Sequence, residues 1–144
     1  MESEYMQYTR KIYPLGVRFQ KFGDDYGSVT KNGLNSLDDI IKAKAEYKRL
    51  LRGFIEMRND LAAITPPSLI SGEHNELINN YDLYYQGTNE MADSLKVEEN
   101  PPRADQELYK HGLELQEKAT KNIVALTKIM TQLSQCKSLG ESLM

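Results

Sequence analysis

Two stretches of this chain repeat apolar residues at alternating spacings of three and four, and this rhythm constrains the fold more than any other feature. The first contains Tyr5, Tyr8, Ile12, Leu15, Phe19, Phe22, Tyr26 and Val29, and the second contains His74, Leu77, Tyr81, Tyr84, Thr88, Met91 and Leu95. Such spacing places the residues on one side of a helix, as in the seam of a coiled coil. Because a seam stays in water only if another helix covers it, the sequence predicts long helices packed together.

The composition is that of a soluble globular protein, with 40% hydrophobic and 27% charged residues in 144 positions. This length predicts one domain with one core. The longest apolar runs, such as residues 61 to 64, are far below the ~18 residues needed to span a bilayer, so no transmembrane segment is expected. The acidic amino terminus lacks the apolar run of a secretory signal, which favours a cytoplasmic location.

Proline and turn signals divide the chain into four predicted helices, over about residues 4–31, 36–63, 72–96 and 102–138. Pro14 lies inside the first heptad pattern and predicts a kink or break near Tyr13, because proline removes a helical hydrogen bond and crowds the preceding turn. Ser36, with Asp39 three residues later, resembles a capping box at the start of the second helix.

The two Pro-Pro pairs mark the other boundaries. Pro66 and Pro67 end the second helix, and Ser71 is the expected cap of the third. Asn100 is the expected cap of the fourth helix, with Pro101 as its first helical residue.

The fold class predicted is all-α: an up-and-down antiparallel four-helix bundle with coiled-coil-like seams. The apolar stripes over residues 5–29, 37–64 and 74–95 would measure about 36, 40 and 32 Å at ~1.5 Å per residue, close enough in length to pack side by side. The fourth helix would measure about 45 to 50 Å, so its end could project past the bundle. This overhang would expose Leu133, Cys136 and Leu139 unless something covers them.

Catalytic and metal chemistry have little support in the sequence, so we predict no catalytic residue, no cofactor and no metal. Glu107, His111 and Glu114 share one helix face but read best as a solvated polar face, because no nucleophile or second base accompanies them. His74 is interpreted as a structural histidine that packs at the end of the bundle and bonds a nearby loop. Cys136, the only cysteine, is interpreted as a buried small hydrophobe.

Three surfaces are candidates for protein interaction. They are the basic side of the second helix, the tyrosines of the third and the projecting end of the fourth: Lys42, Lys48, Arg49, Arg52, Tyr81, Tyr84, Tyr85, Leu133 and Leu139. Each also has an internal interpretation. The basic side chains could pair with the acidic fourth helix, and the tyrosine rings could lie in the core with their hydroxyls at its rim.

Nucleic acid is disfavoured as a partner. Residues 1–64 carry 11 Lys or Arg against 9 Asp or Glu, and residues 65–144 carry 7 against 12, so the halves have net charges of +2 and −5. Neither half has the concentrated basic surface that phosphate binding needs.

The stretch Leu61-Ala62-Ala63-Ile64-Thr65-Pro66-Pro67, followed by His74-Asn75-Glu76-Leu77 and by Tyr81 and Met91, resembles uncharacterised small helical proteins of Gram-positive bacteria and their phages. The resemblance covers about residues 37 to 95 and implies a helical bundle without implying an activity. Many such proteins look like lipoproteins, but this chain lacks a signal and an amino-terminal lipidated cysteine.

These observations favour a non-catalytic protein-protein interaction or adaptor module, with a protein partner or a homo-oligomer, as the functional hypothesis. Three alternatives remain open. One is a ligand-binding or enzymatic bundle with a cavity between its helices. Another is a bacterial or phage regulator that inhibits a host protein through the acidic second half. The third is a secreted helical protein like those of type VII secretion, although Trp-x-Gly and the Tyr-x-x-x-Asp/Glu signal are absent.

Overall fold

Four long helices form a bundle in the computed structural model, which describes residues 3–31 and 33–143, and the side chains of these residues except 134 and 136–143. The all-α fold class is therefore confirmed. The elements in chain order are α1 Glu4–Val29, α2 Leu37–Ala63, the 3₁₀ turn η1 Ser68–Ile70, α3 Ser71–Asp93, β1 Leu95–Lys96, β2 Arg103–Ala104 and α4 Gln106–Leu143.

The first helix is continuous through Pro14, so of the two outcomes predicted there, a kink or a break, the break does not occur. Ser3 caps the helix, because its hydroxyl accepts a hydrogen bond from the Met6 amide at 3.1 Å. Apolar burial stabilises the helix after Pro14, because Leu15 and Phe19 are both buried.

The predicted cap of α2 is confirmed at Ser36, whose hydroxyl accepts from the Asp39 amide at 3.1 Å. The Asp39 carboxylate completes a variant of the capping box by accepting from the Asn35 amide at 3.0 Å. The predicted cap of α3 is wrong. Ser71 is already helical, and its hydroxyl donates to the Ser68 carbonyl at 3.0 Å within the preceding 3₁₀ turn.

The boundary between the third and fourth helices also differs from the prediction. Residues 95–104 form a short antiparallel hairpin in which Leu95 pairs with Ala104, so α3 ends at Asp93 instead of reaching residue 96. Asn100 does not cap α4. The helix begins at Gln106, after Asp105 accepts a hydrogen bond from the Leu108 amide at 3.1 Å. The cap of α4 is therefore Asp105, after the second Pro-Pro pair, and not Asn100 before it.

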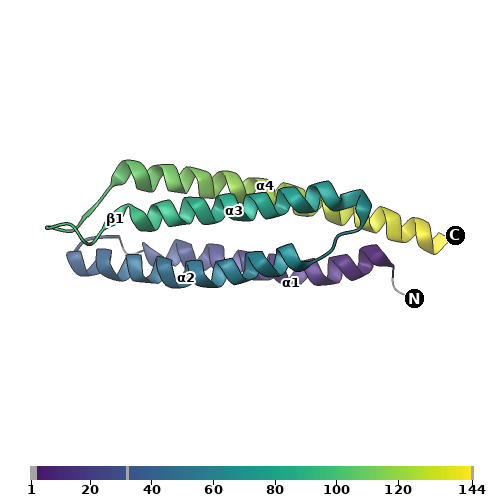
Figure 1. The fold of residues 1–144 in the computed structure, drawn as a ribbon, viewed down its shortest axis with the longest axis horizontal. Helices are drawn as coiled ribbons and strands as arrows, with labels where there is room; N and C mark the ends of the chain where they lie inside the picture. The colour runs from purple at the N-terminus through teal and green to yellow at the C-terminus, as the bar shows by residue number, and fades with distance from the viewer. Residues whose placement is uncertain (1–2, 32, 144) are drawn as a thin grey trace.

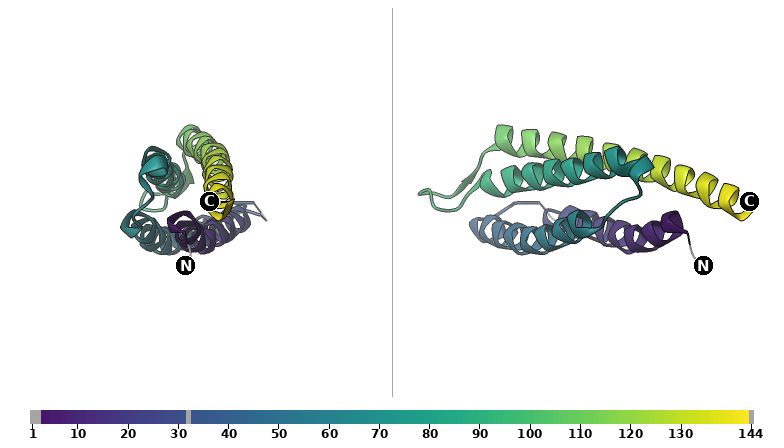
Figure 2. Two further views of the ribbon diagram at one scale, coloured as in Figure 1. Left: turned by 90° about the vertical axis from the view of Figure 1, so that its right-hand side faces the viewer. Right: turned by 45° about the vertical axis from the view of Figure 1, so that its right-hand side comes forward.

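The helices lie along one long axis, with the hairpin at one end and both chain termini at the other (Figure 1). The yellow end of α4 extends beyond the start of α3, as the length comparison predicted, and it approaches the start of α1 in both further views (Figure 2). None of the helices in residues 3–31 and 33–143 is long and apolar enough to cross a membrane.

Aromatic rings fill the centre of the bundle. Phe54 of α2 stacks on Tyr84 of α3 with ring centroids 5.1 Å apart, and Phe19 of α1 meets Tyr84 edge-on at 4.9 Å. Such pairs stabilise a core by about 0.5–1.5 kcal/mol beyond the area they bury. The same cluster includes the rings of Phe22, Tyr26, Tyr47 and Tyr81.

Candidate functional site

An elongated groove with a volume of about 710 Å³ opens between α1 and α4 towards the core. We call it the α1–α4 groove. On α1 it extends from Ile12 to Asp24, which is about three turns or ~18 Å of helix. Its other residues are Leu15, Gly16, Phe19, Gln20 and Gly23 of α1, Leu61, Leu77, Tyr81 and Tyr84 at the floor, and Thr120, Ile123, Val124, Thr127, Lys128, Thr131 and Gln132 of α4.

The groove exists because α4 packs mainly on α3 and much less on α1. At one end the Thr30 and Tyr109 hydroxyls are 3.4 Å apart. At the other end Tyr8 and Ile12 of α1 face Met130 of α4 around a space of about 20 Å³. The α1–α4 groove lies between these two places.

Glycine widens the opening on the α1 side. A Cβ atom at Gly16 would meet nothing within 4 Å, and one at Gly23 would meet only the Tyr84 hydroxyl, at 3.9 Å. Glycine weakens a helix by about 1 kcal/mol relative to alanine. Because a side chain at Gly16 or Gly23 would not clash with the rest of the chain, internal packing does not explain why these positions are glycine.

Two tyrosine hydroxyls open into the floor of the groove. Tyr81 and Tyr84 are only 2% and 3% exposed, yet neither hydroxyl forms a hydrogen bond to a described residue, and neither is among the fully enclosed polar atoms. Burial raises the pKa of both phenols, so the hydroxyls stay protonated and can donate. These two predicted interface residues therefore belong to the groove, although their rings are in the core.

The rims of the groove carry exposed apolar side chains. Val17, on the adjoining flank of α1, is 52% exposed, and Val124 of α4 is 62% exposed. Asp24 and Lys128 lie in the lining, and neither forms an ion pair with a residue that the structure describes. The site thus combines an apolar floor, hydroxyl groups and one charge of each sign.

The remaining predicted tyrosine does not reach the groove. Tyr85 is partly buried against the core on another side of α3. Because consecutive helical residues point about 100° apart, Tyr84 and Tyr85 face different surroundings.

The basic face of α2 is largely paired within the chain. Lys42 bonds Asp38 at 2.8 Å, Arg49 bonds Glu46, and Lys48 bonds Asp93 of α3 at 3.2 Å. These partners come from α2 and α3, so the acidic α4 is not the source of pairing that the sequence suggested. Arg52 is exposed.

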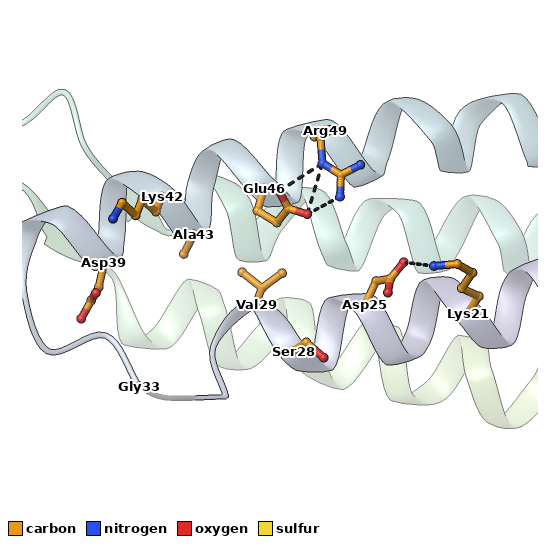
Figure 3. A pocket seen from close by; sticks show the side chains of 10 residues that line it. All are labelled: Lys21, Asp25, Ser28, Val29, Gly33, Asp39, Lys42, Ala43, Glu46 and Arg49. Atoms are coloured by element: carbon orange, nitrogen blue, oxygen red, sulfur yellow. Dashed lines mark hydrogen bonds and ion pairs between the residues drawn. The ribbon is translucent and has the colours of Figure 1, made fainter.

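A polar pocket of about 580 Å³ lies beside this face, between α1 and α2 (Figure 3). Arg49 points to Glu46, and Lys21 bonds Asp25 at 3.2 Å. Each of these cations thus has a carboxylate neighbour, which leaves this pocket without the free positive charge that would hold an anion.

The third predicted surface, at the end of α4, is described only in part. Leu133 is partly buried against the core and is not the exposed residue that was expected. Leu139 and Cys136 lie outside the side chains that the structure describes.

Neither histidine lines the groove. His74 is buried, as predicted for a structural histidine, and its Nδ1 lies 2.6 Å from the Tyr8 hydroxyl of α1. Burial lowers its pKa, and the Leu61 and Ile64 carbonyls oppose that shift without forming a regular hydrogen bond to Nε2. His111 is exposed and its Nδ1 lies 2.6 Å from Glu90. Among the described residues, no three His, Cys, Asp or Glu side chains could together hold a metal ion.

Sequence reasoning identified the groove's tyrosines but not the groove. The missed residues include Gly16, Gln20, Gly23 and Val124, which no seam includes. The available signal was the pair of glycines Gly16 and Gly23 in the first helix. Their spacing of seven residues was the mark of a shared face.

Comparison with known proteins gives no match to a protein-family model, to a curated protein or to a solved structure. The resemblance of residues 37 to 95 to small bacterial and phage proteins therefore stays a prediction.

Proposed function

We propose that this protein is a non-catalytic binding module whose α1–α4 groove receives a helix of a protein partner. The observation that carries the proposal is an apolar groove, open along three turns of α1, with exposed valines on both rims. An amphipathic helix binds such a groove by placing residues at spacings of three, four and seven into it. The opening at Gly16 and Gly23 would admit large side chains of that helix.

The chemistry of the lining favours binding over catalysis. The groove brings together hydroxyls and amides with a single carboxylate, Asp24, and a single cation, Lys128, at different ends. General acid-base work needs a titratable group paired with a second group within hydrogen-bond reach of one substrate atom. Separated charges instead suit the two ends of an elongated partner.

A small-molecule ligand is the second candidate, and the size of the groove favours it. Its volume of about 710 Å³ falls within the roughly 300–1,000 Å³ range of ligand pockets. The exposed valines outside the floor favour the helix, because a small ligand within the groove would leave them in water.

Photo-cross-linking in an extract of the source cells tests the proposal. A benzoylphenylalanine at Val124 should give adducts with the mass of a protein, because this position borders the groove. The matched control is the same residue at Ile129, which is 46% exposed on α4 but does not line the groove. Equal adduct yields at both positions, or none at Val124, would contradict the proposal.

A further inference from the structure

The exposed face of α1 carries a symmetric pattern centred on Gln20. Seven residues before Gln20 stands Tyr13, which is 72% exposed, and seven residues after it stands Gly27. Three residues before it stands Val17, and three residues after it stands Gly23. With 3.6 residues per turn, all four point within about 60° of the direction of Gln20. Each of these two large exposed side chains thus has a glycine at its mirror position.

This is the arrangement that two antiparallel copies of α1 would need. A two-fold axis over Gln20 places each residue opposite its mirror position on the other copy, and such an interface must be self-complementary. Tyr13 would then lie over Gly27 of the second copy, and Val17 would lie at the same level as Gly23. A Cβ atom at Gly27 would meet nothing within 4 Å, so the space for the Tyr13 ring is free.

We infer that the α1–α4 groove is the interface of an antiparallel homodimer, in which α1 of a second copy lies along the groove with Gln20 at the two-fold axis. The inference rests on the proposed function, since it names the helix that the groove receives. It explains why α1 keeps glycines that internal packing does not require.

The Tyr84 hydroxyl gives independent support for an occupant. Only 3% of this residue is exposed. Its hydroxyl faces the groove at Gly23 and forms no hydrogen bond to a described residue. The hydroxyl is not enclosed by the chain, so it is available to donate a hydrogen bond to an occupant of the groove. The Gln20 amide of the second copy, one turn from the residue over Gly23, has the required chemistry.

Charge complementarity fixes the same register. The mirror position of Asp24 is Gly16, so Asp24 of the second copy would lie over Gly16. Lys128 adjoins Thr127, which lies beside Ile12 one turn before Gly16. Asp24 of one copy and Lys128 of the other, both without an ion pair to a described residue, are thereby brought together twice in the dimer.

Sedimentation equilibrium of the full chain over a range of concentrations is the first test, and it should give a reversible association to the mass of two chains. Gly27→Leu should fold, because the added side chain enters free space on an exposed helix face, and it should weaken the dimer. Asp24→Lys and Lys128→Asp should each weaken association about tenfold, and the double variant should recover it. The matched control, Lys11→Asp on another face of α1, should leave the dimer unchanged.

Cysteine pairing tests the register in a Cys136→Ser background. Mixing the Tyr13→Cys and Gly27→Cys variants under mild oxidation should give mixed disulfides, because these positions face one another only in the antiparallel register. Lys11→Cys with Gly27→Cys should give few. A mass of one chain at every concentration, or disulfides that ignore the mirror relation, would overturn the dimer.

The two proposals fail in different ways. A monomer whose Val124 position captures a foreign protein would overturn the dimer and leave the helix-binding function standing. A monomer that captures no protein but binds the apolar dye anilinonaphthalene sulfonate, more weakly in the Gly16→Leu variant, would overturn both proposals. That result would favour a small ligand as the occupant of the groove. A dimer that survives all the α1 substitutions would place the interface elsewhere and reject the inference.

Discussion

Gly87 of α3 and Gly112 of α4 lie so close that neither helix has room for a side chain at this point. A Cβ atom built on Gly87 would stand 2.5 Å from the Gly112 carbonyl oxygen and 2.8 Å from the Gln116 amide. The close approach is anchored by the Gln116 side chain, which donates to the Thr88 hydroxyl at 2.9 Å. Because this contact draws α4 onto α3, it also withdraws α4 from α1 and so helps to open the groove.

Replacing Gly112 by alanine should therefore destabilise the protein by about 1–3 kcal/mol, the usual effect of overpacking a rigid contact. Backbone atoms are the obstacle, since the nearest neighbours include the Met91 amide at 3.0 Å, and they cannot rotate away as a side chain could. Urea unfolding followed by circular dichroism measures the change. Gly72→Ala is the control, because a Cβ there meets nothing within 4 Å. Equal stabilities of the two variants would show that the helices separate freely.

Tyr26→Phe should leave the free energy of unfolding unchanged or raise it by about 1 kcal/mol. The Tyr26 hydroxyl is buried and has no hydrogen-bond partner among the described residues, so removing it removes an uncompensated desolvation penalty. Burial also raises the pKa of this phenol, which reflects the same lack of solvent.

Tyr8→Phe is the matched substitution with the opposite expected sign. The Tyr8 hydroxyl bonds His74 Nδ1 at 2.6 Å, and its loss would leave a buried ring nitrogen without that partner at a cost of about 1–3 kcal/mol. Both variants are measured by urea unfolding at neutral pH. A larger loss for Tyr26→Phe than for Tyr8→Phe would show that the Tyr26 hydroxyl has a partner in solution.

Stability should fall on mild acidification because of His74. Burial lowers the pKa of His74 from its usual 6.5, so below that value the unfolded chain takes up a proton that the folded protein resists. The stability is fully present above about pH 6.5 and is lost as the pH falls towards the folded pKa, with a slope of up to about 1.4 kcal/mol per pH unit. Unfolding curves from about pH 7.5 to about pH 5.5 measure this slope. His74→Gln should flatten the profile, and an unchanged profile would assign the slope to other groups.

The two heptad seams predicted the helices and most of the core, because apolar periodicity reports which side of a helix is buried whatever covers it. Phe19, Leu77 and Tyr84 are buried as their positions predicted. Local capping was less predictable where two candidates competed. Asn100 and Asp105 are both good caps, and the pairing of Leu95 with Ala104 decides between them by extending the loop into a hairpin.

The candidate site was harder to predict because it depends on which helix pairs come together. The rhythm of α1 and α4 does not reveal that α4 would favour α3 over α1, since that choice depends on a backbone contact between Gly87 and Gly112. Glycine carries no hydropathy signal of its own. The basic face of α2 was easy to recognise in the sequence, because every Lys and Arg is visible there. The sequence does not show that Lys48 pairs with Asp93 and Arg49 with Glu46.

The glycines of α1 offer a last prediction that separates the stability of one chain from its interactions. Gly16→Ala and Gly27→Ala combined should raise the free energy of unfolding of the monomer by about 1–2 kcal/mol, because each alanine favours the helix and its Cβ meets nothing within 4 Å. Chemical unfolding at a protein concentration low enough to keep the chain monomeric measures this gain. Gly33→Ala is the contrasting control. It should lose stability, because Gly33 has a φ of +81°, which alanine adopts only under strain. A loss of monomer stability in the double variant would mean that the fold of the single chain requires these glycines. Their presence would then be explained by the backbone of α1 and not by the open side of the groove.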